Sequence, residues 1–217
     1  MPAVRRLLLV LLLGLVACKV KDPPAITAKL TDGFDRDAVG DSYFPTGEGF
    51  AVVKGALSAK GAHNHPLWLR AKLPHNVRIE FDCWSTSLTA QGQPVGDIKV
   101  EVFGDGRSYD PDGGGYTATG YEVIFGGWSN SKSIIARLDE HGKDVVSRVL
   151  PKVAANKHYH WRIERRGKQL TWWIDDDASP FLQYDDPTPL DGANHEYFAF
   201  NNWEADTWFD NLVITPL

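Results

Sequence analysis

The chain has 217 residues, a net charge of −5 at neutral pH and a hydrophobic share of 43%. This length suits one sizeable domain with its own core. Acidic and basic residues are interspersed without a basic stripe, which excludes the charge pattern of a nucleic-acid-binding protein.

The first eighteen residues have the order of a secretory signal. Arg5 and Arg6 precede a short apolar run, 7–16, which leads into the sequence Leu15-Val16-Ala17-Cys18. This order resembles the signal peptide and lipobox of bacterial lipoproteins. We therefore expect residues 1–17 to be removed and Cys18 to carry acyl chains that anchor the protein to a membrane. The alternative is a plain signal peptide in which Cys18 is incidental.

A lipidated Cys18 places the protein outside the cytoplasm, tethered to the cell envelope. The next residue is Lys19 rather than Asp, which favours the outer membrane over the inner one if the source is Gram-negative. Residues 18–29 are polar and contain Pro23-Pro24, so we expect a short linker there. Cys83 is then left without a disulfide partner, and its alternating run predicts a buried, small apolar side chain.

The rest of the chain alternates between apolar and polar residues with period two, which is typical of antiparallel strands with one buried face. No window of ten residues has a convincing helical period. Residues 161–165 and 170–175 flank Arg166-Gly167-Lys168 and predict a tight hairpin with aromatic cross-strand pairs. The other expected strands are 50–53, 67–70, 77–81, 98–102, 121–125, 133–138, 158–164 and the closing strand 208–214.

The strand 159–164, the hairpin after it and the closing run Phe209–Ile214 resemble the concanavalin A-like lectin/glucanase superfamily. The early sequence Asp32-Gly33-Phe34-Asp35 looks like the N-terminal strand entry of that superfamily. The resemblance implies an all-β, antiparallel jelly-roll sandwich over residues 30–217, with the first and last strands side by side. It also allows a structural Ca²⁺ where these strands meet, with Asp35 and Asp210 as weak candidate ligands; no other cofactor is expected.

The resemblance does not decide the activity, because the fold hosts lectins, hydrolases and lyases. Its glucanases carry paired carboxylates spaced Glu-x-Asp-x-x-Glu, and this chain lacks that motif. Glu80-Phe81-Asp82 begins it, but Ser85 stands where the last acid is needed, and Glu101 is accompanied by Lys99. A retaining glucanase of the usual type is therefore not expected.

Two stretches have the composition of a carbohydrate site, in which indoles stack on sugar faces and amides bind hydroxyls. The first, 126–130, offers Trp128 and Asn130, with Arg137 on the next strand; the second, 200–208, offers Asn201, Asn202 and Trp203. The alternative for the first is a wide hairpin turn with Trp128 as a lid on the core. The alternative for the second is a polar turn whose amides cap backbone groups.

Histidine pairs and an acidic loop are weaker candidates for a metal site. His63 and His65 are two residues apart on a segment expected to be extended, as are His158 and His160, so each pair would point one way. Residues 105–116 form an acidic, glycine-rich loop whose oxygens suit calcium, although it lacks EF-hand spacing. A flexible loop is the simpler interpretation.

Three functions remain open. The leading hypothesis is an envelope-tethered, lectin-like protein that binds an oligo- or polysaccharide on the concave face of the sandwich. The second is a glycoside hydrolase or polysaccharide lyase, for which Glu122, Tyr121 and His63 are the candidate catalytic residues. The third is a non-catalytic envelope protein that binds another protein through an exposed apolar patch.

Overall fold

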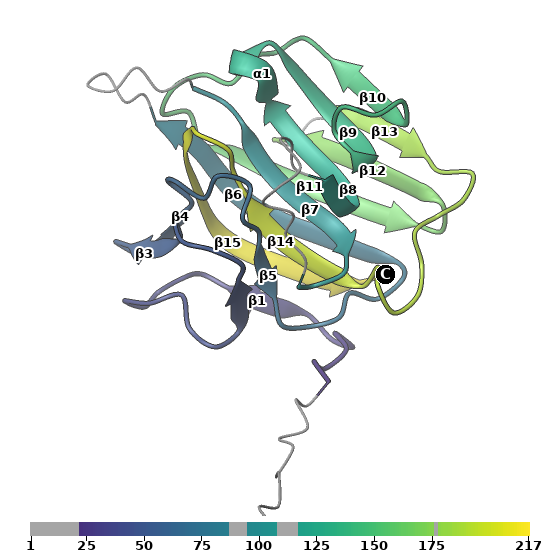
Figure 1. The fold of residues 1–217 in the computed structure, drawn as a ribbon, viewed down its shortest axis with the longest axis horizontal. Coiled ribbons are helices and arrows are strands. Elements are labelled where there is room, and N and C mark those ends of the chain that lie inside the picture. The colour runs from purple at the N-terminus through teal and green to yellow at the C-terminus, as the bar shows by residue number, and fades with distance from the viewer. Residues whose placement is uncertain (1–21, 87–94, 108–116, 176–177) are drawn as a thin grey trace, which may run out of the picture.

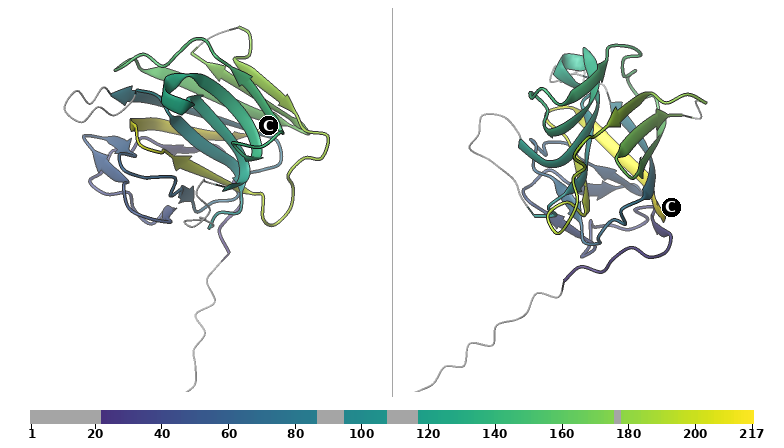
Figure 2. Two further views of the ribbon diagram at one scale, coloured as in Figure 1. Left: turned by 45° about the horizontal axis from the view of Figure 1, so that its top comes forward. Right: turned by 90° about the vertical axis from the view of Figure 1, so that its right-hand side faces the viewer.

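A computed structural model describes residues 22–86, 95–107, 117–175 and 178–217. The predicted signal peptide, Cys18 and most of the acidic loop 105–116 lie outside these ranges. The described part forms two antiparallel sheets with a single short helical turn, and the sheets pack face to face as two layers (Figures 1 and 2). No helix in these ranges has the length and apolar character needed to cross a membrane.

The larger sheet has eight strands, seven of which follow the order β13-β12-β11-β6-β15-β4-β3, while β1 also pairs with β15. Their bounds are β1 (Leu30–Asp32), β3 (Ala51–Val53), β4 (Ala56–Ser58), β6 (Val77–Thr86), β11 (Tyr159–Arg166), β12 (Gln169–Ile174), β13 (Leu182–Asp185) and β15 (Asp206–Pro216). We call it the eight-stranded sheet.

The seven-stranded sheet has the order β10-β9-β8-β7-β14-β5-β2. Its strands are β2 (Tyr43–Pro45), β5 (Leu67–Leu69), β7 (Ile98–Gly104), β8 (Thr117–Gly126), β9 (Lys132–Asp139), β10 (Val145–Arg148) and β14 (Tyr197–Asn201), and the turn α1 (Gly127–Asn130) joins β8 to β9.

The strands expected from the alternating pattern are all present, and several are longer than expected. The hairpin is β11–β12, with Ile163 opposite Trp172. The end strands lie side by side, because Leu30–Asp32 of β1 pairs with Leu212–Ile214 of β15. The predicted all-β jelly-roll sandwich is confirmed.

The core lies between the sheets and is rich in aromatic rings. Phe81 of β6 packs 5.3 Å from Trp161 within its own sheet and 6.2 Å from Phe198 of the other sheet, measured between ring centroids. Trp161 and Trp172 are fully buried and 4.4 Å apart. Burying one such side chain contributes about 1.5–3 kcal/mol, so these rings hold the layers together. Cys83 is also buried in this core, as predicted, and burial raises the pKa of its thiol well above the ordinary value.

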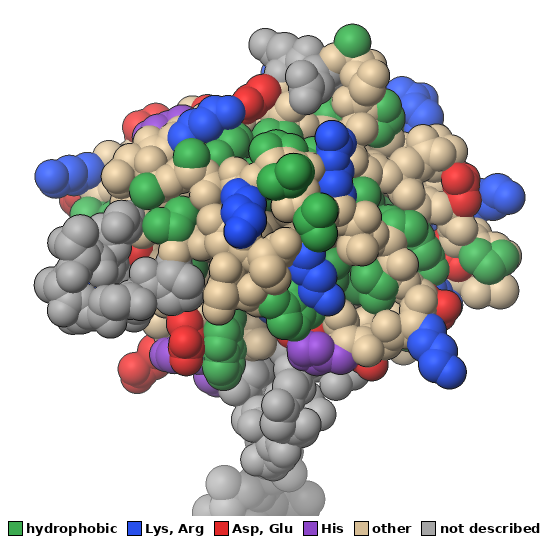
Figure 3. Space-filling model, turned by 90° about the horizontal axis from the view of Figure 1, so that it is seen from above, with side chains coloured by type: hydrophobic (Ala, Val, Ile, Leu, Met, Phe, Trp, Pro, Cys, Tyr) green, Lys and Arg blue, Asp and Glu red, His purple; other side chains and the backbone are tan. Residues whose placement is uncertain are grey.

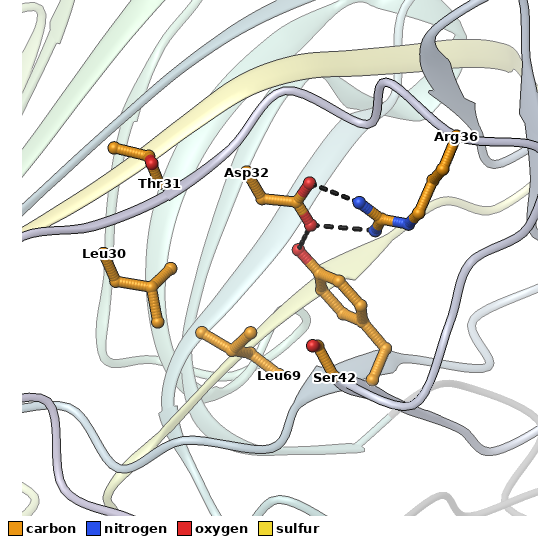
Figure 4. A pocket seen from close by; sticks show the side chains of 7 residues that line it. Leu30, Thr31, Asp32, Arg36, Ser42 and Leu69 are labelled. Carbon is orange, nitrogen blue, oxygen red and sulfur yellow. Dashed lines mark hydrogen bonds and ion pairs between the residues drawn. The ribbon is translucent and has the colours of Figure 1, made fainter.

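A small cavity of about 210 Å³ lies beside β1 and β2, near the N-terminal end of the described chain (Figure 4). Asp32 accepts hydrogen bonds there from both terminal nitrogens of Arg36 at 2.6 and 2.9 Å and from the Tyr43 hydroxyl at 2.8 Å. Burial opposes ionisation of Asp32, but these bonds hold its pKa below the ordinary value. The Asp32 carboxylate is thus bound within the chain, and this cluster fixes the entry of the chain into the fold.

Candidate functional site

The outward face of the seven-stranded sheet carries buried polar side chains. On β7, Ile98, Val100 and Val102 face the core, so Lys99 and Glu101 point to the other side. The same alternation turns Glu122 of β8 outward. Asn201, at the end of β14, lies opposite Lys99. We call these four residues the polar floor; each is at most 2% exposed.

Lys99 is the cation of this floor. Its Nζ donates to Asn64 Oδ1 at 2.9 Å and to Glu140 Oε2 at 2.8 Å, and it lies 3.9 Å from Glu122 Oε1. Burial disfavours the charged ammonium, yet the neighbouring carboxylates, Glu122 first, raise the pKa of Lys99 above its ordinary value. Lys99 therefore stays charged and ties β7 to the loop at Asn64 and to the β9–β10 turn at Glu140.

Glu101 and Glu122 lie opposite each other on β7 and β8 but differ in their surroundings. Glu101 Oε1 accepts hydrogen bonds from the backbone N–H groups of Thr119 at 2.8 Å and Gly120 at 2.7 Å, and from the Thr119 hydroxyl at 3.0 Å. Both oxygens of Glu122 are buried, and neither accepts a hydrogen bond. Burial, opposed by Lys99, raises the pKa of Glu122 well above its ordinary value.

Two loops form one side of a rim above the floor. The backbone N–H of His63 donates to the Trp203 carbonyl at 3.2 Å, and that of Asn64 donates to the Asn202 carbonyl at 2.7 Å. The rings of His63 and Trp203 meet edge to face at 5.4 Å. The Trp203 N–H donates to Asp97 Oδ2 at 3.1 Å, which connects this loop to the start of β7. Trp203 is 46% exposed, so an indole stands open beside the polar floor.

The other side of the rim is Trp128 with His141. His141 Nε2 lies 3.3 Å from Glu140 Oε1, and the His141 ring meets Trp128 edge to face at 5.7 Å. Trp128 packs on an apolar part of the same sheet face that includes Ile124 and Ile134. The Nζ atom of Lys132 lies 3.9 Å from the centre of the Trp128 ring, so a cation already covers this ring.

The turn that carries Trp128 is left-handed. Gly126 has φ 70°, and Trp128, Ser129 and Asn130 have φ of 51°, 57° and 58°. Each left-handed non-glycine residue costs about 1–2 kcal/mol, so other contacts must hold this turn. Asn130 supplies two of them, because its side chain donates to the Val153 carbonyl at 2.8 Å and accepts from the Val153 N–H at 3.0 Å. Asn130 is therefore a positioning residue for Trp128.

Three other candidates from the sequence, Arg137, Tyr121 and Asn202, are held in contacts within the fold. Arg137 and Tyr121 are opposite each other on β9 and β8, and both donate to Asp186 Oδ2, at 2.9 and 2.6 Å. Tyr121 belongs to the core, and Arg137 shares its side of the sheet. Asn202 is buried and donates to the carbonyls of Ala59 and Ala205, as expected for an amide that caps a turn. These contacts give all three residues structural roles.

The histidine pairs do not form a metal site. His63 and Asn64 have φ of 46° and 62°, so this segment is a turn and the expected extended geometry is wrong. His158 stacks on Trp84 at 4.2 Å, and His160 contacts Asp82 at 2.8 Å through Nδ1. Within the ranges that the structure describes, no three His, Cys, Asp or Glu side chains are arranged to hold a metal ion.

The calcium candidates Asp35 and Asp210 belong to the eight-stranded-sheet side. Burial and the charges of Asp82, Asp35 and Asp32 raise the pKa of Asp210. Asp82 is itself bound, because its Oδ2 accepts from the Asn211 amide at 2.9 Å. These carboxylates repel one another, and among the described residues no three His, Cys, Asp or Glu side chains come close enough together to hold a calcium ion.

Comparisons with known proteins show the fold. The carbohydrate-binding module CBM66 from Bacillus subtilis has a TM-score of 0.57 at 14% identity, over 80% of this chain and 95% of the module. The exoplasmic/lumenal domain of VIP36, in a Ca²⁺/Man2-bound form, has 0.57 at 8% identity over 88% of each chain. A prokaryotic β-1,3-1,4-glucanase (lichenase) derived from a mouse hindgut metagenome has 0.56 at 9% identity, over 88% of this chain and all of that one.

The sequence comparisons are less informative. A family model described as farnesoic acid O-methyl transferase matches residues 108–211, which is less than half of the chain. The curated proteins give no match. The two antiparallel sheets and the structural likenesses establish a concanavalin A-like fold, which the carbohydrate-binding module, the VIP36 domain and the glucanase share.

Proposed function

We propose that the protein binds a glycan on the outward face of the seven-stranded sheet, across the polar floor. The observation that carries this proposal is an exposed indole, Trp203, beside buried polar atoms that lack partners. Glu122 has two free acceptors, and the Asn201 side-chain nitrogen is a free donor. Sugars present both apolar faces, which stack on indoles, and hydroxyls, which need donors and acceptors.

Trp203 is the first residue to test. Trp203→Ala removes the stacking surface and is expected to weaken binding about tenfold, equivalent to about 1.4 kcal/mol. Trp173→Ala is the matched control, because Trp173 is a half-buried indole on the eight-stranded sheet, where it contacts Arg162 at 4.3 Å. A glycan array with the chain from Lys19 onward supplies the ligands, and titration calorimetry then compares the two variants. Equal weakening by both variants, or no binding to any glycan, would contradict the proposal.

The proposal includes the tether. The order of basic residues, apolar run and Cys18 supports lipidation, and residues 22–32 lie at the end of the sandwich opposite α1 (Figure 1). An anchor at that end would hold the α1 end of the sandwich away from the membrane, towards the envelope glycans. In cells, Cys18→Ser should abolish labelling by a palmitate analogue and release the protein from the membrane fraction. Absence of label from the wild type would refute the lipid anchor.

Glycoside hydrolysis is a second candidate function, and the Glu101–Glu122 pair is the observation that favours it. Glycosidases use one ionised carboxylate and one that carries a proton. Glu101 accepts three hydrogen bonds, as a carboxylate does, whereas burial favours the protonated form of Glu122. New reducing ends from a bound glycan, lost in Glu122→Gln with binding retained, would establish this activity.

A protein-binding surface is less well supported. Seen from the end that carries α1, the described apolar side chains are interspersed with lysines and arginines (Figure 3). That end does not present the continuous apolar patch that the third hypothesis requires.

A further inference from the structure

Carboxylates outnumber cations around the polar floor. Glu122 and Glu140 lie beside Lys99, and the charge of Glu101 acts on Glu122. Asp97 belongs to the same cluster, because its pKa, raised chiefly by burial, also responds to the charges of Lys99 and Glu140. Lys99 is already bound to Asn64 and Glu140. Burial favours the protonated form of Glu122, so the negative charge of this region comes from Glu101, Glu140 and Asp97, and its one cation, Lys99, is held by the protein itself.

The negative environment reaches the exposed rim. Glu204 is exposed, and its charge also acts on Asp97, whose Oδ2 holds the Trp203 backbone. The described basic groups on this rim are His63 beside Trp203, His141 beside Glu140, and Lys132, which lies against Trp128. The Trp203 backbone is thus bound to one carboxylate, Asp97, and the next residue, Glu204, carries a second, exposed one. An open indole attracts a cation within about 6 Å of its centre.

Glu122 supplies an independent indication of a ligand. It is 0% exposed, it lies on the same face as Lys99, and neither of its oxygens accepts a hydrogen bond. A buried carboxyl group without a donor is costly, and a ligand that donates N–H or O–H groups would remove that cost.

We propose that the recognised glycan contains amino sugars with free, positively charged amino groups, and that one ammonium lies against Trp203 between Asp97 and Glu204. The proposal rests on the proposed function, since it names the class of glycan for the same face. The carboxylates of the floor add a favourable field for the ammonium. The same field repels uronate and sulfate groups, which argues against acidic polysaccharides and against a lyase that acts on them.

Three β-1,4-linked tetrasaccharides make the test, because they share a backbone and differ at C2. Glucosamine tetramer carries ammonium groups at mildly acidic pH, N-acetylglucosamine tetramer carries neutral amides, and cellotetraose carries hydroxyls. We expect the glucosamine tetramer to bind about tenfold more tightly than the other two, and this preference to shrink as salt is raised. Titration calorimetry on the full chain in detergent measures all three.

Variants locate the effect. Glu204→Gln alters an exposed side chain, so folding should be retained, and Asp97→Asn removes the second carboxylate. Each should reduce the preference for the glucosamine tetramer severalfold. Glu204→Gln should leave the affinity for the neutral tetramers unchanged, whereas Asp97→Asn, because Asp97 also holds the Trp203 backbone, is judged by the ratio of the cationic to the neutral affinity alone. Glu80→Gln, on the outward face of the eight-stranded sheet, is the control and should change nothing.

The outcomes separate the two proposals. Equal or tighter binding of a neutral tetramer, or unchanged preference in both rim variants, would overturn the amino-sugar inference and leave glycan binding in place. Failure of every neutral, cationic and acidic glycan to bind would overturn both.

Discussion

Strands β6 and β7 have the same alternating pattern but different surroundings. Both direct apolar residues into the core and charged residues outward. On β6 the outward residues, among them Arg78 and Asp82, are half-buried and pair with side chains of β11, whereas on β7 Lys99 and Glu101 are buried. Alternation in the sequence therefore shows which residues of a strand point outward. Whether those outward residues are buried or solvated distinguishes a candidate site from an ordinary surface.

The largest expected difference between the two faces is in the cost of losing a cation. Lys99→Met leaves Glu140 and the carboxylates beside it without their buried partner, so we expect a loss of about 3–5 kcal/mol in the free energy of unfolding. Arg78→Met on β6 should cost about 0–1 kcal/mol, because Arg78 is partly exposed and Arg166 still pairs with Glu164. Urea denaturation measures both, and equal losses would contradict the distinction between the faces.

A pair of glycines gives the next comparison. A Cβ on Gly126 would lie 2.5 Å from Asn130 Oδ1 and 2.6 Å from Val153 Cγ2, and φ is 70° there. Gly167, in the β11–β12 turn, has φ 57° but open space around the same position. We expect Gly126→Ala to cost about 2–4 kcal/mol, from clash and strain together, and Gly167→Ala about 1 kcal/mol, from strain alone. Thermal unfolding compares the two variants. A greater loss of stability at Gly167 would refute the close packing of Gly126 against Asn130 and Val153.

Two glutamates should make the stability of the fold depend on pH in opposite directions. These are the smallest changes in stability that we expect. Glu122 has a raised pKa, so its ionisation destabilises the fold as pH rises above the ordinary value of 4.5. Relative to the wild type, Glu122→Gln should gain stability as pH rises above that value and match it in acid. Unfolding followed at several pH values measures this difference, and a variant that falls below the wild type as pH rises would contradict the burial of an unpartnered Glu122.

Glu164, on β11, has a pKa lowered by Arg78 and Arg166 despite its burial. Its ionised form stabilises the fold above the ordinary value of 4.5, and this stability is lost as pH falls through the lowered pKa. Glu164→Gln should therefore be less stable than the wild type near neutrality, and the deficit should disappear in acid. The same unfolding series checks it, and a deficit that persists in acid would show that the loss is not electrostatic.

The sequence predicted the sandwich well because its central strands have one face in the core. Strand β6 alternates over its whole length and β11 over residues 159–163, and both were recognised. β14 was not delimited because Tyr197–Asn201 is buried on both faces, and β2, β4, β10 and β13 are too short for a period to be evident.

The site was predicted only in part. Trp203, Glu122 and His63 were named and lie together at the polar floor and its rim, with Trp128 on the opposite side. Glu101 was not named as a candidate catalytic residue. The acid opposite it, Glu122, is on another strand, and the sequence does not reveal the register in which two strands pair.

The alternation of side chains along a strand would have excluded two other candidate site residues, Arg137 and Tyr121. Arg137 is two residues from Ile135, and Tyr121 is two from Val123, and both apolar residues belong to the core. Residues two apart on a strand share a face, so neither Arg137 nor Tyr121 lies on the face that carries Glu122.

Hydrogen exchange with and without a bound glycan tests the central claim most directly, because it reports which face the ligand covers. We predict slower exchange at residues 61–65 and 201–204, whose backbones form the rim, and no change in β6 or β11. Protection on β6 and β11, with the rim loops unaffected, would place the ligand on the eight-stranded sheet and contradict the account.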